Sequence, residues 1–292
     1  MAQPYLHNST HKEYIREKWV EFASLIVDPD KGLSVITFPA EEMHDLRLFV
    51  EKGLISWTET ETGSFYITKG KIVCFEKITK YYLTLRKSLT NATVESLEIG
   101  RYLRQKYHAI MGGDQAIFPV DVVNLDYDGN ISKSWVPIDE IINLVFEFQA
   151  LHRKDFSLFL TWPYTENEDE GRYKDLLKQV IGDNLGDPRA VSFKEIYEAD
   201  FPAVDELDYN NLSIIGISKV IIQKAARHRY NLHKNEFFIY GEENRRPMFS
   251  ILLNFDFQTD TPEHTIYTNC VTKSLEDINY LRNPAAQVVA EA

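Results

Sequence analysis

The sequence predicts a doubly wound α/β domain with a mostly parallel seven-stranded sheet, a C-terminal antiparallel β-hairpin and helices on both faces. Short, almost wholly apolar segments alternate with longer segments of helical periodicity, as expected for strands that are covered on both faces. Each crossover between parallel strands lays a helix back over the sheet. The last two β-rich segments are separated only by a short turn, so they are expected to run antiparallel.

The first elements follow this alternation. Residues 11–27 have one apolar face and predict an amphipathic helix. After a turn, residues 33–38 are short, β-rich and apolar, and predict strand one. Pro39 opens an acid-rich segment that predicts a helix ending at Gly53. Residues 55–68 are rich in Thr and Gly, and fit either a small hairpin or an exposed loop.

The rest of the chain repeats the unit. Residues 93–99 fit a short strand three, although they also fit the start of the helix that follows. The other strands are expected at residues 72–75, 120–125, 156–162, 236–240 and 248–257, with a long helix at residues 212–228. These elements predict a helical extension over residues 1–32, one α/β domain over residues 33–283 and a flexible tail at residues 284–292.

Composition limits the classes of function. The chain has 292 residues, of which 44% are hydrophobic and 13% aromatic, enough apolar area for a folded core. Its two cysteines, Cys74 and Cys270, lie far apart, and His228 and His233 are off the four-residue spacing that places two ligands on one helix face. We expect no metal site and no disulfide. The N-terminus lacks an apolar signal segment and no long apolar run occurs, which predicts a cytoplasmic protein without a membrane partner.

The formal net charge of −12 disfavours nonspecific nucleic-acid binding unless cations gather on one face. Their densest cluster surrounds the end of the long helix, where cations also simply favour the helix dipole. We name four of its members as candidate nucleic-acid contacts: Arg227, Arg229, Arg245 and Arg246. An acidic segment at residues 166–170 follows strand five and would repel phosphate if it borders the cleft.

Five β-α units, a sixth strand and an antiparallel seventh resemble the class I S-adenosylmethionine-dependent methyltransferases over residues 33–260. The resemblance implies that the methyl donor lies across the carboxyl ends of the first strands. It implies that Glu76, after strand two, holds the donor ribose, and that Phe38, at the end of strand one, lines the donor site.

The segment Asn-Leu-Asp-Tyr-Asp-Gly, in which strand four ends, aligns in two ways. Asn124 and Tyr127 match the Asn-Pro-Pro-Tyr pattern of amino-group methyltransferases, whereas Leu125, Asp126 and Gly129 match the Asp-Leu-Asp-Pro-Tyr-Gly pattern of tRNA guanine-N2 dimethyltransferases. An amide or carboxylate there would accept hydrogen bonds from an exocyclic amine, and an aromatic ring would stack on the base. We therefore name Asn124, Asp126 and Tyr127 as catalytic candidates. The same residues also fit a plain turn after a buried strand.

Strand one departs from the family, because bulky and acidic residues follow it where methyltransferases carry a Gly-rich loop. Without glycine, we expect negative φ at most positions of this turn. Two hypotheses remain. The chain is a divergent methyltransferase that acts on an amino group of nucleic acid, or it is an inactive pseudoenzyme that serves as an interaction or scaffold subunit of a larger assembly with a protein partner.

Overall fold

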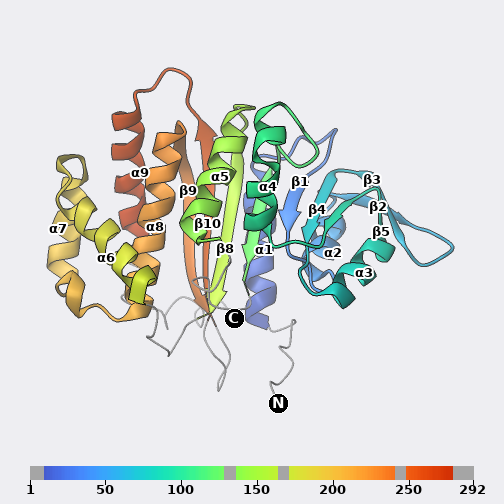
Figure 1. The fold of residues 1–292 in the computed structure, drawn as a ribbon, viewed down its shortest axis with the longest axis horizontal. Helices are drawn as coiled ribbons and strands as arrows, with labels where there is room; N and C mark the ends of the chain where they lie inside the picture. The colour runs from blue at the N-terminus through green and yellow to red at the C-terminus, as the bar shows by residue number, and fades with distance from the viewer. Residues whose placement is uncertain (1–9, 128–135, 164–170, 241–247, 279–292) are drawn as a thin grey trace, which may run out of the picture.

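The computed structural model describes residues 10–127, 136–163, 171–240 and 248–278. A seven-stranded sheet crosses the molecule (Figure 1), and its five neighbouring strands β6, β4, β1, β7 and β8 are parallel. Strand β10 is antiparallel to both β8 and β9. In spatial order the strands are β6 (Thr93–Glu95), β4 (Lys71–Phe75), β1 (Ser34–Thr37), β7 (Val122–Asp126), β8 (Phe156–Pro163), β10 (Met248–Phe257) and β9 (Tyr230–Tyr240).

This sheet confirms the predicted fold class. All seven expected strands form in the expected chain order, and the last strand lies antiparallel between the fifth and the sixth. The sixth strand is longer than predicted, because it begins at Tyr230 rather than Glu236. Its extra residues pair with the last part of β10 across a bulge at Asn254 and Phe255.

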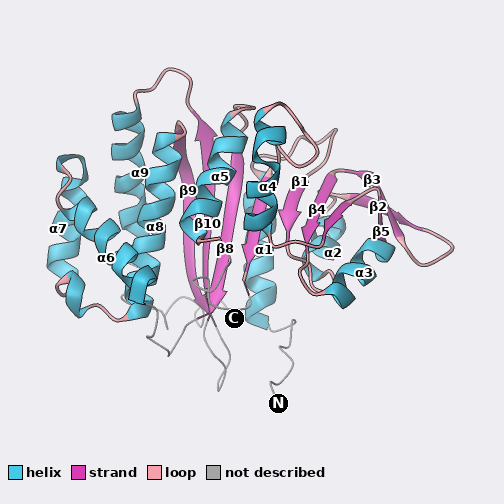
Figure 2. Ribbon diagram, in the orientation of Figure 1, coloured by secondary structure: helices cyan, strands magenta, loops and turns pink. Residues whose placement is uncertain are grey.

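Helices cover both faces of the sheet (Figure 2). One face carries α4 (Ile99–Met111), α5 (Ile138–Ala150) and α8 (Tyr209–Arg227), and α9 (Glu263–Ile278) packs against α8. The other face carries α1 (Thr10–Ser24) and α2 (His44–Glu51). Helices α6 (Gly171–Leu185) and α7 (Val191–Asp200) lie outside α8 and α9.

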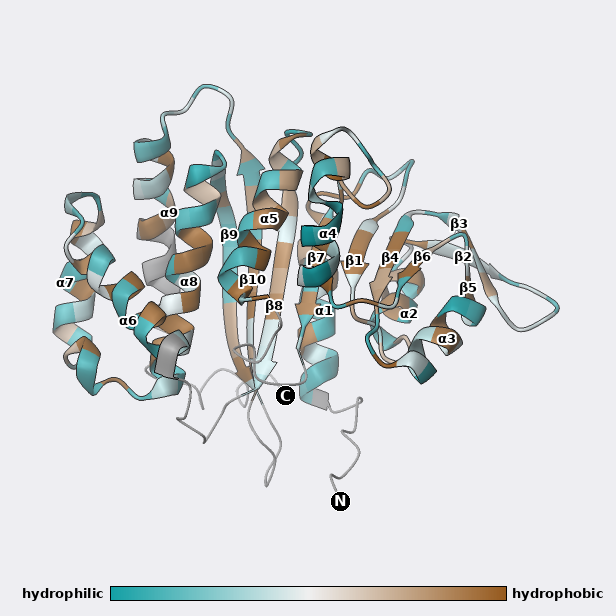
Figure 3. Ribbon diagram, in the orientation of Figure 1, coloured by the Kyte–Doolittle hydropathy of each residue, from teal (hydrophilic) through white to brown (hydrophobic). Residues whose placement is uncertain are grey.

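The two helical layers enclose two hydrophobic cores, because successive side chains of a strand point to opposite faces. On β1, Ile36 packs under α4 and α5, whereas Val35 packs in the second core with Trp19 and Phe22 of α1. Figure 3 shows the brown, apolar central strands between helices whose outer sides are teal. Burial on both faces accounts for the continuous apolar runs from which the strands were predicted.

A second sheet of three short strands lies on the side of the large sheet where β6 and β4 lie: β2 (Ser56–Glu59), β3 (Phe65–Lys69) and β5 (Leu89–Thr90). Strands β2 and β3 are antiparallel, which confirms the hairpin interpretation of residues 55–68. Helix α3 (Thr79–Ser88) runs into β5.

The helix predicted to open at Pro39 begins instead at His44. Residues 39–43 form a turn in which Met43 N donates to Ala40 O, and Met43 adopts φ 53°. In the described part of the chain, no helix is both long and apolar enough to cross a membrane.

Candidate functional site

The strand order reverses between β1 and β7. The chain goes from β1 to β4 on one side and from β7 to β8 on the other, so this pair is the topological switch point of the sheet. The carboxyl ends of the five parallel strands lie at one edge, the lower edge in Figure 1. Ligands of open α/β sheets bind outside the carboxyl ends of the strands at such a point.

Two aromatic candidates meet at the switch point. The rings of Phe38, after β1, and Tyr127, after β7, lie edge to face with centroids 5.5 Å apart. Tyr127 N donates to Thr161 O at 2.9 Å, which fixes its backbone against β8. The Tyr127 hydroxyl is buried without a hydrogen-bond partner among the described residues. Burial raises the pKa of Tyr127 far above its ordinary value, and the charge of Glu98 adds to this shift, so the phenol stays protonated.

Asn124 lies on the opposite face of β7 and is fully buried. Its Nδ2 lies 3.4 Å from Thr37 Oγ1 of β1, a long hydrogen bond. No described residue donates to its buried Oδ1 atom. Buried polar atoms normally have partners, so the amide oxygen within β7 and the hydroxyl just after it, on opposite faces of the strand, are each available to a ligand or water.

Asp126 shares this face with Asn124 and forms an ion pair. Its Oδ2 lies 2.8 Å from Lys12 Nζ of α1. A second ion pair lies nearby. Arg16 Nε is 2.8 Å from Asp45 Oδ1 of α2, and both side chains are almost fully buried. Burial raises the pKa of Asp45 although Arg16 opposes the shift. Burial also acts to lower the pKa of Lys12, but Asp126 and Asp45 outweigh it and leave that pKa raised.

Sequence reasoning missed Lys12, Arg16 and Asp45. Their partners lie too far away in sequence to form a motif: 114 residues for Lys12 and 29 for Arg16. One signal was available. Arg16 directly follows the buried Ile15 and precedes the buried Trp19 by one helical turn, so a cation lies within the apolar stripe of α1.

The donor-side candidates flank β4 and β1. Glu76 Oε1 accepts a hydrogen bond from Ile78 N at 2.7 Å, which turns the carboxylate toward the start of α3. Met43 alone among residues 39–43 has positive φ, in the left-handed conformation, so the expectation of negative φ at most positions of this turn is confirmed. This conformation costs about 1–2 kcal/mol, and burial of the side chain to 3% exposure offsets it.

The basic candidates do not join this edge. Arg227 is exposed at the end of α8, and Arg229 precedes β9, at the edge of the sheet opposite Asp126. Arg229 is engaged structurally, because it donates to backbone carbonyls of Gln258, Thr259 and Thr261. Arg245, Arg246, Gly129 and the acidic segment at residues 166–170 lie outside the described residues. Within the described ranges, no group of three or more His, Cys, Asp or Glu could hold a metal ion.

No family model and no curated protein matches the sequence. Solved structures of similar fold include the following two. TYW2 of M. jannaschii in complex with AdoMet has 10% identity and a TM-score of 0.41, over 87% of this chain and 80% of that chain. A SAM-dependent methyltransferase from Methanosarcina mazei has 9% identity and a TM-score of 0.38, over 78% of this chain and 94% of that chain.

The likeness to these two structures concerns the fold alone. The strand order, with an antiparallel last strand between the fifth and sixth, defines a class I methyltransferase fold. The fold expectation from the sequence resemblance is therefore confirmed.

Proposed function

We propose that the chain binds S-adenosylmethionine at the switch point and transfers its methyl group to an amino group of nucleic acid. Two buried atoms without described partners carry this proposal, Asn124 Oδ1 within β7 and the Tyr127 hydroxyl just after it, on opposite faces of the strand. An amide oxygen accepts hydrogen bonds and a phenol can donate one, so each matches a separate polar group of a bound donor or acceptor.

The residues present fit the donor. Glu76, at the end of β4, would hold the ribose hydroxyls, and the ring of Phe38 supplies an apolar wall beside Tyr127. The left-handed Met43 supplies the sharp turn after β1 that glycine supplies elsewhere. When bound, S-adenosylmethionine supplies an electrophilic methyl group.

Asp126 is the residue that we propose orients the acceptor amine. An ionised carboxylate has two oxygens and about four acceptor positions, and Lys12 engages Oδ2. A carboxylate can accept an amine N–H but cannot donate to it. Such an acceptor would hold the amine with its lone pair toward the methyl group.

Calorimetric titration with S-adenosylmethionine and S-adenosylhomocysteine tests the proposal. We expect micromolar binding to the wild-type protein, which corresponds to about −8 kcal/mol. Asp126→Asn should retain donor binding and lose methyl transfer to RNA or DNA, because the amide has only one acceptor oxygen and would turn NH₂ donors toward the amine. Methyl transfer at the wild-type rate by Asp126→Asn would refute the role of Asp126.

One observation favours the second function, an inactive scaffold. The Lys12–Asp126 pair is mostly buried, so α1 covers part of the proposed acceptor site. In that case neither ligand should give heat, and the melting temperature should stay unchanged at millimolar ligand. A protein partner recovered with the wild-type chain would then support the scaffold, whereas methyl transfer by the purified chain would exclude it.

A further inference from the structure

Helix α3 and the residues around it form a surface whose charge is opposite to that of the whole chain. Residues 77–92 contain four cations and no carboxylate, although the chain has a net charge of −12. All four cations are exposed: Lys77, Lys80, Arg86 and Lys87. Two apolar side chains on the same segment, Ile78 and Leu83, are exposed as well. We call residues 77–92 the α3 surface.

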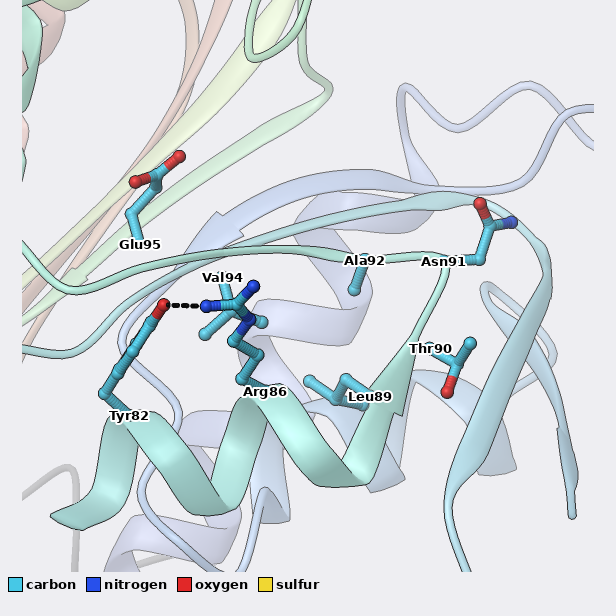
Figure 4. A pocket seen from close by; sticks show the side chains of 8 residues that line it. All are labelled: Tyr82, Arg86, Leu89, Thr90, Asn91, Ala92, Val94 and Glu95. Atoms are coloured by element: carbon cyan, nitrogen blue, oxygen red, sulfur yellow. Dashed lines mark hydrogen bonds between the residues drawn. The ribbon is translucent and has the colours of Figure 1, made fainter. Parts of the chain in front are cut away.

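The α3 surface borders a groove of about 480 Å³ (Figure 4). Arg86 Nη1 donates to the Tyr82 hydroxyl at 2.9 Å, and the guanidinium carbon lies 6.0 Å from the centroid of that ring. The bond holds two planar groups one helical turn apart at the groove. The groove is lined by Tyr82, Arg86, Leu89, Thr90, Asn91, Ala92, Val94 and Glu95.

We propose that this groove binds a base of single-stranded nucleic acid and that the α3 cations contact the adjoining phosphates. Tyrosine and arginine planes stack on bases of any sequence, and exposed lysines follow a phosphate backbone. The groove also offers hydrogen-bonding groups to base edges from Thr90 and Glu95, whereas Asn91 Nδ2 donates to Ile67 O at 3.0 Å. Glu95 would repel a phosphate but accept from an exocyclic amine, so it favours a base at its end of the groove. An acidic peptide would match the cations but would bring no planar group to Tyr82 and Arg86.

The groove lies beside the proposed donor site. Glu95 ends β6, and its carbonyl accepts from Glu76 N at 3.0 Å at the end of the neighbouring β4. A nucleic-acid strand that leaves the groove past Glu95 therefore reaches the edge of the sheet at which the switch point lies. The inference rests on the proposed function for the class of substrate only, because binding to the α3 surface needs no methyl donor.

Fluorescence anisotropy with a short labelled single-stranded RNA, at low salt and without S-adenosylmethionine, tests the surface. We expect Arg86→Glu/Lys87→Glu to bind roughly tenfold or more weakly. The slope of log affinity against log salt should fall by about 0.7 for each phosphate contact that is lost. The matched control is Lys224→Glu/Arg227→Glu, which reverses two cations at the end of α8. Equal loss in both variants, or loss in the control alone, overturns the assignment.

A second pair of variants separates stacking from charge. Tyr82→Phe keeps the ring and loses the bond to Arg86, so it should bind within about threefold of wild type, whereas Tyr82→Ala should lose at least about fivefold. An equally tight double-stranded probe would overturn the single-strand assignment. Calorimetry with S-adenosylmethionine on Arg86→Glu/Lys87→Glu keeps the two proposals apart, since donor binding should survive in a variant that no longer binds RNA. An unchanged melting temperature confirms that this variant is folded.

Discussion

Lys12 Nζ lies 2.8 Å from Asp126 Oδ2, and this ion pair joins the start of α1 to the carboxyl end of β7. The side chains are only 18% and 12% exposed. The neighbouring Arg16–Asp45 pair ties the same helix to α2. Helix α1 is thus attached by charge to the edge of the sheet where the candidate site lies, in addition to its apolar packing through Trp19.

Lys12→Ala is expected to lower the free energy of unfolding by about 2 kcal/mol, because it leaves the Asp126 carboxylate mostly buried without its partner. Lys52→Ala is the matched control, since Lys52 pairs with Glu17 at 3.0 Å with side chains 36% and 50% exposed. It should cost less than about 1 kcal/mol. Urea unfolding measures both. Equal losses would mean that the Lys12–Asp126 pair is as well solvated in solution as the Lys52 pair.

Asn124→Leu separates stability from function. The wild-type amide is buried, makes one long hydrogen bond to Thr37 and leaves Oδ1 without a described partner. An apolar side chain of similar size removes that unsatisfied group, and Thr37→Val removes the hydroxyl that would lose its partner. The double variant Asn124→Leu/Thr37→Val should therefore have a free energy of unfolding no more than about 1 kcal/mol below that of wild type. Methyl transfer should nevertheless be lost. A large destabilisation in urea together with retained transfer would instead make Asn124 a structural residue.

The strands were predictable from sequence because burial on both faces favours mostly apolar residues along each strand, as in residues 72–75. The candidate edge was predictable for the same reason, since polar residues stand directly after these runs. The start of α2 was not, because Pro39 carries a helix-opening signal while the actual turn depends on Met43 in a left-handed conformation that its burial stabilises.

Ion pairs that join distant segments leave no local pattern. Nothing in the sequence around Asp126 indicates Lys12, and only the folded arrangement of α1 over β7 brings them together. The cationic cluster around Arg229 is the reverse case, a sequence pattern that does not mark the candidate site. Its charge density was visible in the sequence, but Arg229 is bound to backbone carbonyls at the far edge of the sheet. The α3 cations are fewer and more widely spaced than that cluster, and only the groove beside them marks them as a candidate binding surface.

Stability should depend on His228 below pH 6.5. Burial lowers the pKa of His228 from 6.5, and nearby Arg227 and Lys224 add to the shift while Glu147 opposes it. The unfolded chain therefore takes up a proton near its ordinary pKa, whereas the native chain does so only at lower pH. The free energy of unfolding contributed by this group is fully present above pH 6.5 and is lost as the pH falls through the native pKa.

Urea unfolding of wild type and His228→Gln across this range measures the effect. The variant should have a flatter slope of unfolding free energy against pH, because its side chain does not titrate. Burial also lowers the pKa of His152, so His152→Gln should change the slope with the same sign. Parallel curves for wild type and His228→Gln would show that the imidazole titrates alike in both states.

Gly100 sets the distance between α4 and the residues around the start of α5, Val136 and Ile141. A Cβ atom at this position would lie 2.6 Å from Val136 Cβ and 2.9 Å from Ile141 Cγ1. Gly100→Ala should therefore lower the free energy of unfolding by about 1–3 kcal/mol, although alanine favours helix by about 1 kcal/mol. Gly182→Ala in α6 is the matched control, because its Cβ would meet no atom within 4 Å. It should raise stability by up to about 1 kcal/mol. Opposite signs in the two variants would establish close packing of α4 against Val136, and a gain in both would mean that this contact relaxes without cost.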